Sequence, residues 1–343
     1  MKKSALVLFA GLVLLFVTPG MVFAQRGGRS AGGAIEIRVA SPLPRNSDWG
    51  RTLDQIAGAV YRYTNRAVRL SNVHDGVHGG EASMLSRLAT NTIQAALLTS
   101  FGISEIVPEV MNLSVPFKIR DDAELDLVLR DVLPYLEERA NSTNFVILAW
   151  SKAGWVNIFS REPILEPNDL RGMSLATSPE SENMNRVFRG MGFNLMEAEV
   201  AEMPTLLASG RVNAIYQSPA AIAPLGLQRH LGNMLDMPIA PFMGAIVLNR
   251  STWDRLGAEN QRILMDVTRR IAADFDSTMP RTINNAVTSM QRGGLNVNRP
   301  NPQQQALWYN EAQRALPPLL GQTFDRSMHD RIGMILERAR NGQ

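Results

Sequence analysis

Cysteine is absent from this sequence of 343 residues. Its absence excludes disulfide bonds, metal sites built from thiolates and a lipid-modified cysteine at the start of a mature protein. Stability must therefore come from packing alone. Hydrophobic residues make up 45% of the chain, which is enough for the packed cores of one large domain or of two ordinary ones.

The chain also has little net charge. The formal charge of +3 at pH 7 falls to +1 when Lys2 and Lys3 are left out. A protein that binds nucleic acid through its backbone phosphates carries a clear basic surface, and nothing of that kind is present. We therefore expect no nucleic-acid partner.

Only one long apolar run occurs, and it lies at the amino terminus. It extends from Ala5 to Val17 behind two lysines and is followed by helix-breaking Pro19-Gly20 and by Ala24. This pattern is typical of a secretory signal peptide over residues 1–24, and the run is short for an uncleaved membrane anchor. We expect cleavage after Ala24, a flexible glycine-rich leader over residues 25–33, and a mature protein that is soluble in the periplasm.

The usual motifs of catalysis are absent. There is no G-x-S-x-G motif, and Ser178, which follows a predicted strand, has no histidine marked as its base. His74 and His78 have the spacing of a helical metal pair, but the glycines in "HDGVHGG" favour a loop. The sequence has no phosphate-binding loop either. We expect no enzyme, no metal and no cofactor, and a hydrolase on the same fold is the weakest alternative.

Apolar patterns of strand and helix alternate along the rest of the chain. Strand patterns occur at residues 35–39, 67–73, 93–100 and 144–150, and a second set begins with "GWVNIFS", "MSLATS" and "VNAIYQS". Helical spacing connects them, including a helix over 122–141. A long late helix starts at a capping-box-like Ser251–Asp254 pair and continues past Pro280 to about Met290. Alternating strands and helices in both halves predict an α/β fold with two parallel-sheet lobes.

The stretch "PNDLRGMSLATSPESENM", from Pro167 to Met184, indicates where a ligand binds. It delivers the carboxyl end of a predicted strand at Thr177, the place where α/β proteins usually hold a small molecule. No cationic residue lies between Gly172 and Met184. The site therefore lacks the local charge that a carboxylate or phosphate ligand would need.

Four segments together resemble the periplasmic solute-binding proteins of tripartite ATP-independent periplasmic (TRAP) transporters, the DctP-type family. These segments are "GGEASMLSRLATNTIQAALLTSFGISEIVPEVMNLSVPFKIRD", "PNDLRGMSLATSP", "LLASGRVNAIYQSPAA" and "FMGAIVLNRSTWDRLGAENQRILMDVTR". The resemblance covers residues 35–295. It implies a two-lobed periplasmic-binding-protein-like fold with a long helix spanning both lobes, a ligand enclosed between the lobes, and delivery to a membrane permease driven by an ion gradient.

The chain departs from this family at its basic positions. Alignment with the family's "P-x-D-L-K-G-L-K-I-R" segment puts Ala176 where acid-binding members have an arginine, and Val156 stands at a second basic position. A guanidinium matches a carboxylate with two hydrogen bonds, and a buried carboxylate without a charged partner is unfavourable. We therefore expect a neutral or hydrophobic ligand, unless Arg45 or Arg51 replaces the missing cation.

A sequence without these basic residues resembles one TRAP subgroup, in which the binding protein works with a periplasmic tetratricopeptide-repeat partner. The resemblance implies one lobe of residues 34–149 with about 238–275, and another of residues 150–237 with about 276–343. A non-transport ligand sensor or scaffold that binds a partner protein is the alternative function. The predicted ligand-binding residues are Trp49, Glu81, Thr99, Ser100, Trp155, Ala176, Thr177, Ser178, Tyr216, Gln217 and Met243.

Overall fold

A computed structural model describes residues 33–199, 202–222 and 225–342. The predicted signal peptide and residues 25–32 of the predicted leader lie outside the described residues. The strands are β1 (Ile35–Ala40), β2 (Val68–Val73), β3 (Ala95–Thr99), β4 (Phe145–Ser160), β5 (Ser174–Thr177), β6 (Asn194–Glu197), β7 (Ala214–Gln217), β8 (Asn233–Leu235), β9 (Ala240–Asn249) and β10 (Asn296–Asn298).

Helices connect these strands throughout the described chain. They are α1 (Asp48–Tyr63), α2 (Glu81–Ala89), α3 (Ser100–Ser104), α4 (Asp122–Asn141), α5 (Pro167–Arg171), α6 (Glu182–Gly190), α7 (Met203–Ser209), α8 (Pro219–Ile222), α9 (Arg250–Arg255), α10 (Gly257–Arg292), α11 (Pro302–Ala315) and α12 (Arg326–Arg340). Short 3-10 turns are η1 (Pro108–Ser114), η2 (Pro179–Ser181), η4 (Leu227–His230) and η5 (Pro317–Leu319). None of the helices in the described part of the chain is both long and apolar enough to cross a bilayer.

The strands hydrogen-bond in the order β2-β1-β3-β9-β4-β7-β5-β6, with β8 also on β4 and β10 on β8. Within the first half, β1 is parallel to β2 and β3, and within the second half, β5 is parallel to β6 and β7. Strands β9 and β4 lie between the halves and run antiparallel to each other and to their outer neighbours. This mixed α/β arrangement confirms the predicted fold class.

Strand β4 differs from the prediction of two separate strands around residues 144–150 and 154–160. It is one strand of 16 residues that pairs with β9 in its first part and with β7 and β8 in its last. The register shifts between Lys152 and Trp155, where Gly154 has φ +95. The polar residues and the glycine there resemble a turn in sequence, but a bulge absorbs them and the strand continues.

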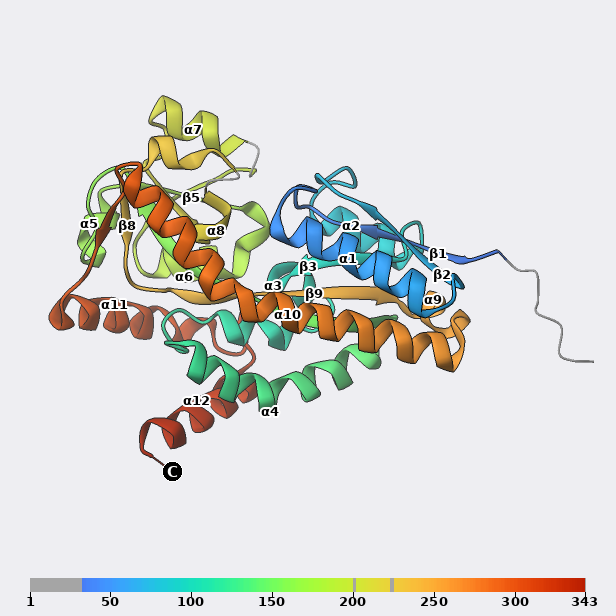
Figure 1. The fold of residues 1–343 in the computed structure, drawn as a ribbon. Coiled ribbons are helices and arrows are strands. Elements are labelled where there is room, and N and C mark those ends of the chain that lie inside the picture. The colour runs from blue at the N-terminus through green and yellow to red at the C-terminus, as the bar shows by residue number, and fades with distance from the viewer. Residues whose placement is uncertain (1–32, 200–201, 223–224, 343) are drawn as a thin grey trace, which may run out of the picture. The chain divides into compact units, whose positions relative to one another are not determined.

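Helix α10 corresponds to the long late helix predicted from the sequence. It has 36 residues and spans both halves of the sheet. Figure 1 shows it, in orange, beginning beside α1 and α9 and ending beside α8, and it packs along β4 between them. Its start differs from the predicted Ser251–Asp254 capping box. Asn249 caps the preceding helix α9 instead, because its side-chain oxygen accepts the N–H of Ser251 at 2.9 Å.

Helix α10 holds β4 at the level of the bulge. The carboxylate of Asp276 accepts the backbone N–H of Lys152 through both oxygens, each at 3.0 Å, and the hydroxyl of Ser151. Burial raises the pKa of Asp276 to about 6. One turn later Pro280 lacks the N–H that would bond back to the carbonyl of Asp276. The helix and the strand are thus joined where both pass from one half of the sheet to the other.

Side chains alternate across the sheet, so a core forms on each face. In β9, Met243, Ala245 and Val247 join one cluster, whereas Ile246 and Leu248 join the other, which packs under α1 and α10. The first cluster continues into the second half through α6 and α11. A third cluster lies on the other face of β5 and β7.

Helix α1 contains a glycine whose replacement is expected to stabilise the protein. Gly58 lies in the helix interior, is exposed, and has open space around the position of a Cβ. Gly58→Ala is expected to raise the free energy of unfolding by about 0.5–1 kcal/mol, because alanine loses less backbone entropy in a helix. Urea denaturation of the two proteins checks this, and a destabilised variant would contradict the open space at this position.

Candidate functional site

Two edges of the sheet face each other across the middle of β4. Strand β3 runs in the same direction as β4 and ends at Thr99, level with Gly244 of β9 and thus with Ser151 of β4. Strand β7 runs the opposite way and ends at Gln217, level with Asn157. The carboxyl ends of β3 and β7 therefore point toward each other. They are separated along β4 by residues 151–157, which is about 20 Å of extended strand. We call residues 151–157 the crossing segment.

Four predicted site residues lie together at the first edge, which is formed by β3 and the start of α3. The hydroxyl oxygen of Thr99 caps α3 by accepting the N–H of Phe101 at 3.3 Å. The hydroxyl of Ser100 is buried and donates to the carbonyl of Met243 at 3.5 Å. Met243 itself is fully buried in the core below. The edge is therefore small, polar and held close to β9.

Glu81 is the fourth of these residues and the buried acid of the first edge. It opens α2, and its carboxylate accepts the N–H of Thr99 at 3.0 and 3.1 Å and that of Gly102 at 2.7 Å. Burial raises the pKa of Glu81 to about 7, although these N–H groups act in the opposite direction. Its carboxyl group therefore gains or loses a proton near neutral pH.

The second edge holds four more predicted residues, at the ends of the parallel neighbours β5 and β7. Thr177 ends β5 and Ser178 follows it, and Tyr216 and Gln217 end β7. The ring of Tyr216 packs edge-on against Phe188 of α6 with centroids 5.1 Å apart, and burial raises the pKa of its hydroxyl. The side-chain oxygen of Gln217 accepts the N–H of the next residue at 2.8 Å.

Three buried oxygen atoms at the second edge have no hydrogen-bond partner among the described residues. They belong to Thr177, Asn185 and Ser218. Asn185 lies over the end of β5, since its amide nitrogen donates to the carbonyl of Ser178 at 3.0 Å. The sequence analysis missed Asn185 and Ser218. Ser218 directly follows Gln217 and so had a signal, but Asn185 lies between Met184 and Arg186 inside a predicted helix and had none.

Trp155 lies in the crossing segment between the two edges. Its indole N–H donates to the carboxylate of Asp122 of α4 at 2.9 Å, and its backbone pairs with Pro241 of β9. The ring is partly buried against the core that both halves share. Trp155 is therefore held in place by α4 beside the gap between the edges.

One contact joins the two edges directly. Glu180 of η2 follows Ser178, and Gly80 precedes Glu81. A Cβ built on Gly80 would lie 2.2 Å from Oε1 of Glu180, so only glycine allows this approach. The contact brings the second edge against the start of α2. The sequence analysis did not single out Glu180, because an exposed acid in a polar turn carries no signal of its own.

Two predicted site residues and one aligned position are packed into cores. Trp49 stacks on Phe275 of α10 with ring centroids 4.3 Å apart. Ala176 has no exposed surface and belongs to the third cluster, and Val156 is also buried. Packing accounts for the burial of all three. The position that the resemblance aligns with the family's arginine thus lies among apolar side chains in this protein.

The two arginines considered as replacements lie at the start of α1. Arg51 is paired with Asp48 and donates to the carbonyl of Asn46. Arg45 is exposed and forms no ion pair within the described residues. Among the same residues, no lysine or arginine is bonded to any predicted ligand-binding side chain.

The histidine motif lies in a turn, as its glycines predicted. His74 is buried, and its Nε2 atom lies 3.1 Å from Oδ1 of Asp54. The side-chain amide of Asn72 donates to the same oxygen at 2.9 Å. Within residues 33–199, 202–222 and 225–342, no three histidine or acidic side chains gather in a way that would hold a metal ion. The loop therefore gives no support for metal binding.

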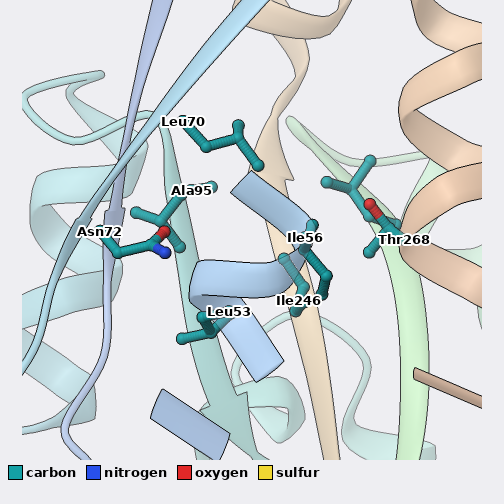
Figure 2. A pocket seen from close by; sticks show the side chains of 9 residues that line it. Leu53, Ile56, Leu70, Asn72, Ala95, Ile246 and Thr268 are labelled. Carbon is teal, nitrogen blue, oxygen red and sulfur yellow. The ribbon is translucent and has the colours of Figure 1, made fainter. Parts of the chain in front are cut away.

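Two hollows lie away from the edges. Figure 2 shows a cavity of about 10 Å³ under α1, bordered by Leu53, Ile56 and Ile246 and by the unpartnered oxygens of Asn72 and Thr268. It has room for about one water molecule. A surface depression of about 490 Å³ lies along α4 and is lined by Asp126, Leu129, Arg130 and Leu133. Neither hollow includes a predicted site residue.

A mixed α/β sheet in two halves, crossed by two strands and one long helix, with polar strand ends facing each other, defines the class of periplasmic binding proteins. The chain belongs to the family described as bacterial extracellular solute-binding protein, family 7 (DctP), whose sequence profile matches residues 39–320. Members of this family are solute receptors of TRAP transport rather than enzymes. The protein is therefore a binding protein for a small organic molecule.

Individual relatives are distant in sequence and close in fold. A solute-binding protein of Verminephrobacter eiseniae is 24% identical over 247 residues, which cover 70% of this chain and 72% of the relative. A TRAP solute-binding protein of Ralstonia eutropha with bound (S)-2-acetolactate superposes with a TM-score of 0.81 at 19% identity, covering 88% of this chain and 99% of that one. A Bordetella pertussis receptor with bound pyroglutamic acid has a TM-score of 0.79 at 17% identity, covering 90% and 100%.

Proposed function

We propose that this receptor encloses a neutral or hydrophobic organic molecule between the two edges and delivers it to a TRAP membrane permease. The unpartnered oxygens of Thr177, Asn185 and Ser218 carry the proposal. A buried polar atom without a partner is unfavourable, and three of them at one strand edge are suited to the hydrogen bonds of a ligand. All three are uncharged, so they favour a neutral ligand group.

The charges around the edges favour the same class of ligand. Glu81 and Glu180 are acids at the edges that form no ion pair among the described residues. Glu197, level with Thr177 at the end of β6, is paired with Arg189, and Lys152 of the crossing segment is paired with Asp126. The solved relatives described above hold acids, and a carboxylate in such a site needs a cation to offset its desolvation. Here the family's arginine position is Ala176, inside a core. An anionic ligand would therefore meet two unpaired acids, and the cations Lys152 and Arg189 are already paired with other acids.

The predicted lobes give the mechanism of capture. We propose that residues 34–149 with about 238–275 move as one lobe, and residues 150–237 with about 276–343 as the other. The crossing segment, with its bulge at Gly154, and the Pro280 turn of α10 are where the connections are least regular. Closing there brings the edges together and excludes water from the ligand.

Export and delivery complete the proposed role. The sequence pattern of residues 1–24 supports secretion to the periplasm. The family supports a permease as the membrane partner. The tetratricopeptide-repeat partner is proposed from the absent arginines alone, and co-purification of the mature receptor with such a protein from the same operon would test it.

The ligand can be identified without knowing it in advance. We expect native mass spectrometry of the mature protein, purified without denaturant, to show a bound uncharged organic molecule. Thr177→Val and Ser218→Ala remove single hydroxyl groups that lack protein partners, and each is expected to weaken retention about tenfold, the effect of one lost hydrogen bond. Equilibrium dialysis of the extracted molecule measures the change.

Thr268→Val is the matched control, because its buried hydroxyl also lacks a partner but borders the small cavity under α1. It should retain the ligand as the wild type does. Arg45→Gln should do the same. A carboxylic acid in the mass spectrum, together with loss of its binding in Arg45→Gln, would overturn the neutral-ligand proposal and leave the family assignment intact.

A further inference from the structure

The contact of Glu180 with Gly80 places a second carboxylate beside the buried Glu81. Glu180 comes from η2 at the second edge, and Glu81 opens α2 at the first. Oε1 of Glu180 lies at the surface of Gly80, the residue directly before Glu81. In the described part of the chain, Glu180 forms no ion pair. The contact therefore brings two unpaired acids close together.

The other neighbours of Glu81 do not neutralise it. Strand β3 and helix α3 offer backbone N–H groups from Thr99 and Gly102 and have no charged side chain. On its own helix the nearest cation is Arg87, exposed in the last turn, and His78 lies in the preceding turn with its Nε2 buried and unpartnered. The charge of Glu180 adds to burial in raising the pKa of Glu81.

We propose that closing of the site is coupled to the uptake of one proton by Glu81, because closing brings Glu180 against Gly80. When the edges separate, Glu180 leaves, so the carboxylate form of Glu81 is favoured. When they meet, the charge of the second acid favours the protonated form. This inference rests on the proposed function, since it names the regulation of the same site.

The direction of the pH dependence follows from linkage. The pKa of Glu81 is higher in the closed form than in the open form. The closed form is therefore favoured below about pH 7, and this advantage is lost as the pH rises through that value. An anionic solute would add a negative charge next to Glu180 in the closed form. The contact between Glu180 and Gly80 thus favours ligand capture at low pH. It also disfavours closure around an anionic ligand.

Two labels can report closure without any ligand. The chain has no cysteine, so Ala89→Cys and Ala208→Cys introduce two unique thiols at exposed ends of α2 and α7. Spin labels on both thiols give the distance distribution by pulsed electron resonance at several pH values from about 8 to about 6. The ratio of closed to open molecules is expected to rise about three- to tenfold over this range, since one pKa unit corresponds to a factor of ten.

Three substitutions in the labelled protein isolate the acid pair. Glu81→Gln cannot titrate, so its closed fraction should lose the part of the pH dependence that Glu81 causes. The pH dependence that remains in the Glu81→Gln variant comes from other titrating groups, such as Asp276. Glu180→Gln should close more readily than the wild type at about pH 8 and change less with pH. Glu182→Gln is the control, because Glu182 is in the next turn but pairs with Arg186 and Arg189.

A wild-type closed fraction that does not change with pH would overturn the proposal. So would a Glu81→Gln or Glu180→Gln variant that titrates as the wild type does. Because these measurements use no ligand, they fail or succeed independently of the ligand identification that tests the proposed function.

Discussion

Replacing Ala176 with arginine is expected to lower the free energy of unfolding by about 3 kcal/mol or more and to abolish retention of the native ligand. Ala176 has no exposed surface and lies between Met196 of β6 and Ile215 of β7 in the sheet register. Its face of the sheet belongs to an apolar cluster. A guanidinium introduced there has neither room nor a counter-charge, so both overpacking and burial of the charge oppose folding.

Asn194→Arg provides the matched control, because it adds the same charge at an exposed position of the neighbouring strand β6. Its stability should stay close to that of the wild type. Urea denaturation gives the free energies, and native mass spectrometry of the folded fraction gives the retained ligand. An Ala176→Arg protein as stable as the control would show that space for the family's arginine still exists, which would contradict the packing described above.

Gly154→Val is expected to destabilise the protein by about 3 kcal/mol through two separable causes. The backbone of Gly154 has φ +95, a conformation that side chains with a Cβ rarely adopt. In addition, a Cβ there would lie 2.2 Å from Cδ1 of Ile283 and 3.7 Å from Cγ of Met279, both on α10. The substitution therefore strains the bulge of β4 and pushes it away from the long helix.

Gly294→Val separates the two causes. Gly294 has a similar φ of +101, but nothing lies within 4 Å of its Cβ position. Its loss of stability should reflect backbone strain alone, about 1–2 kcal/mol. Equal unfolding midpoints in urea for the two variants would mean that Ile283 moves aside at no cost, and that α10 does not restrict the crossing segment.

Local patterns predicted most of the elements. The helix over 122–141 and the long helix past Pro280 were predicted because apolar residues recur at helical spacing over many turns. Strands were predicted from short apolar runs, and the predicted ends at Ser100 and Ser218 lie one residue past the observed ends at Thr99 and Gln217. Strand β4 was not, since a glycine and polar residues in its middle look the same in sequence whether the chain turns or bulges.

Some residues of the candidate site could be predicted from the sequence and others could not. Thr99, Ser100, Thr177 and Gln217 were predicted because strand ends are visible in the sequence, and the structure places them at the two edges. Trp49 and Ala176 have the same residue types as ligand-contacting side chains, yet they pack against Phe275 and against the third cluster. Which face of an element a residue occupies depends on what packs against it, and that information is not local.

The sequence by itself determined the α/β class, the resemblance to TRAP receptors and the loss of the family's arginine at position 176, because each depends only on residue type and order. Only the tertiary structure decided that this position is filled by a core, that Asp276 joins α10 to β4, and that Glu180 meets Gly80 beside Glu81. The physical reason is that the first of these depends on how neighbouring strands pack, and the other two join residues about 100 positions or more apart. Their burial, and hence their charge state, exists only after the two halves of the sheet have packed.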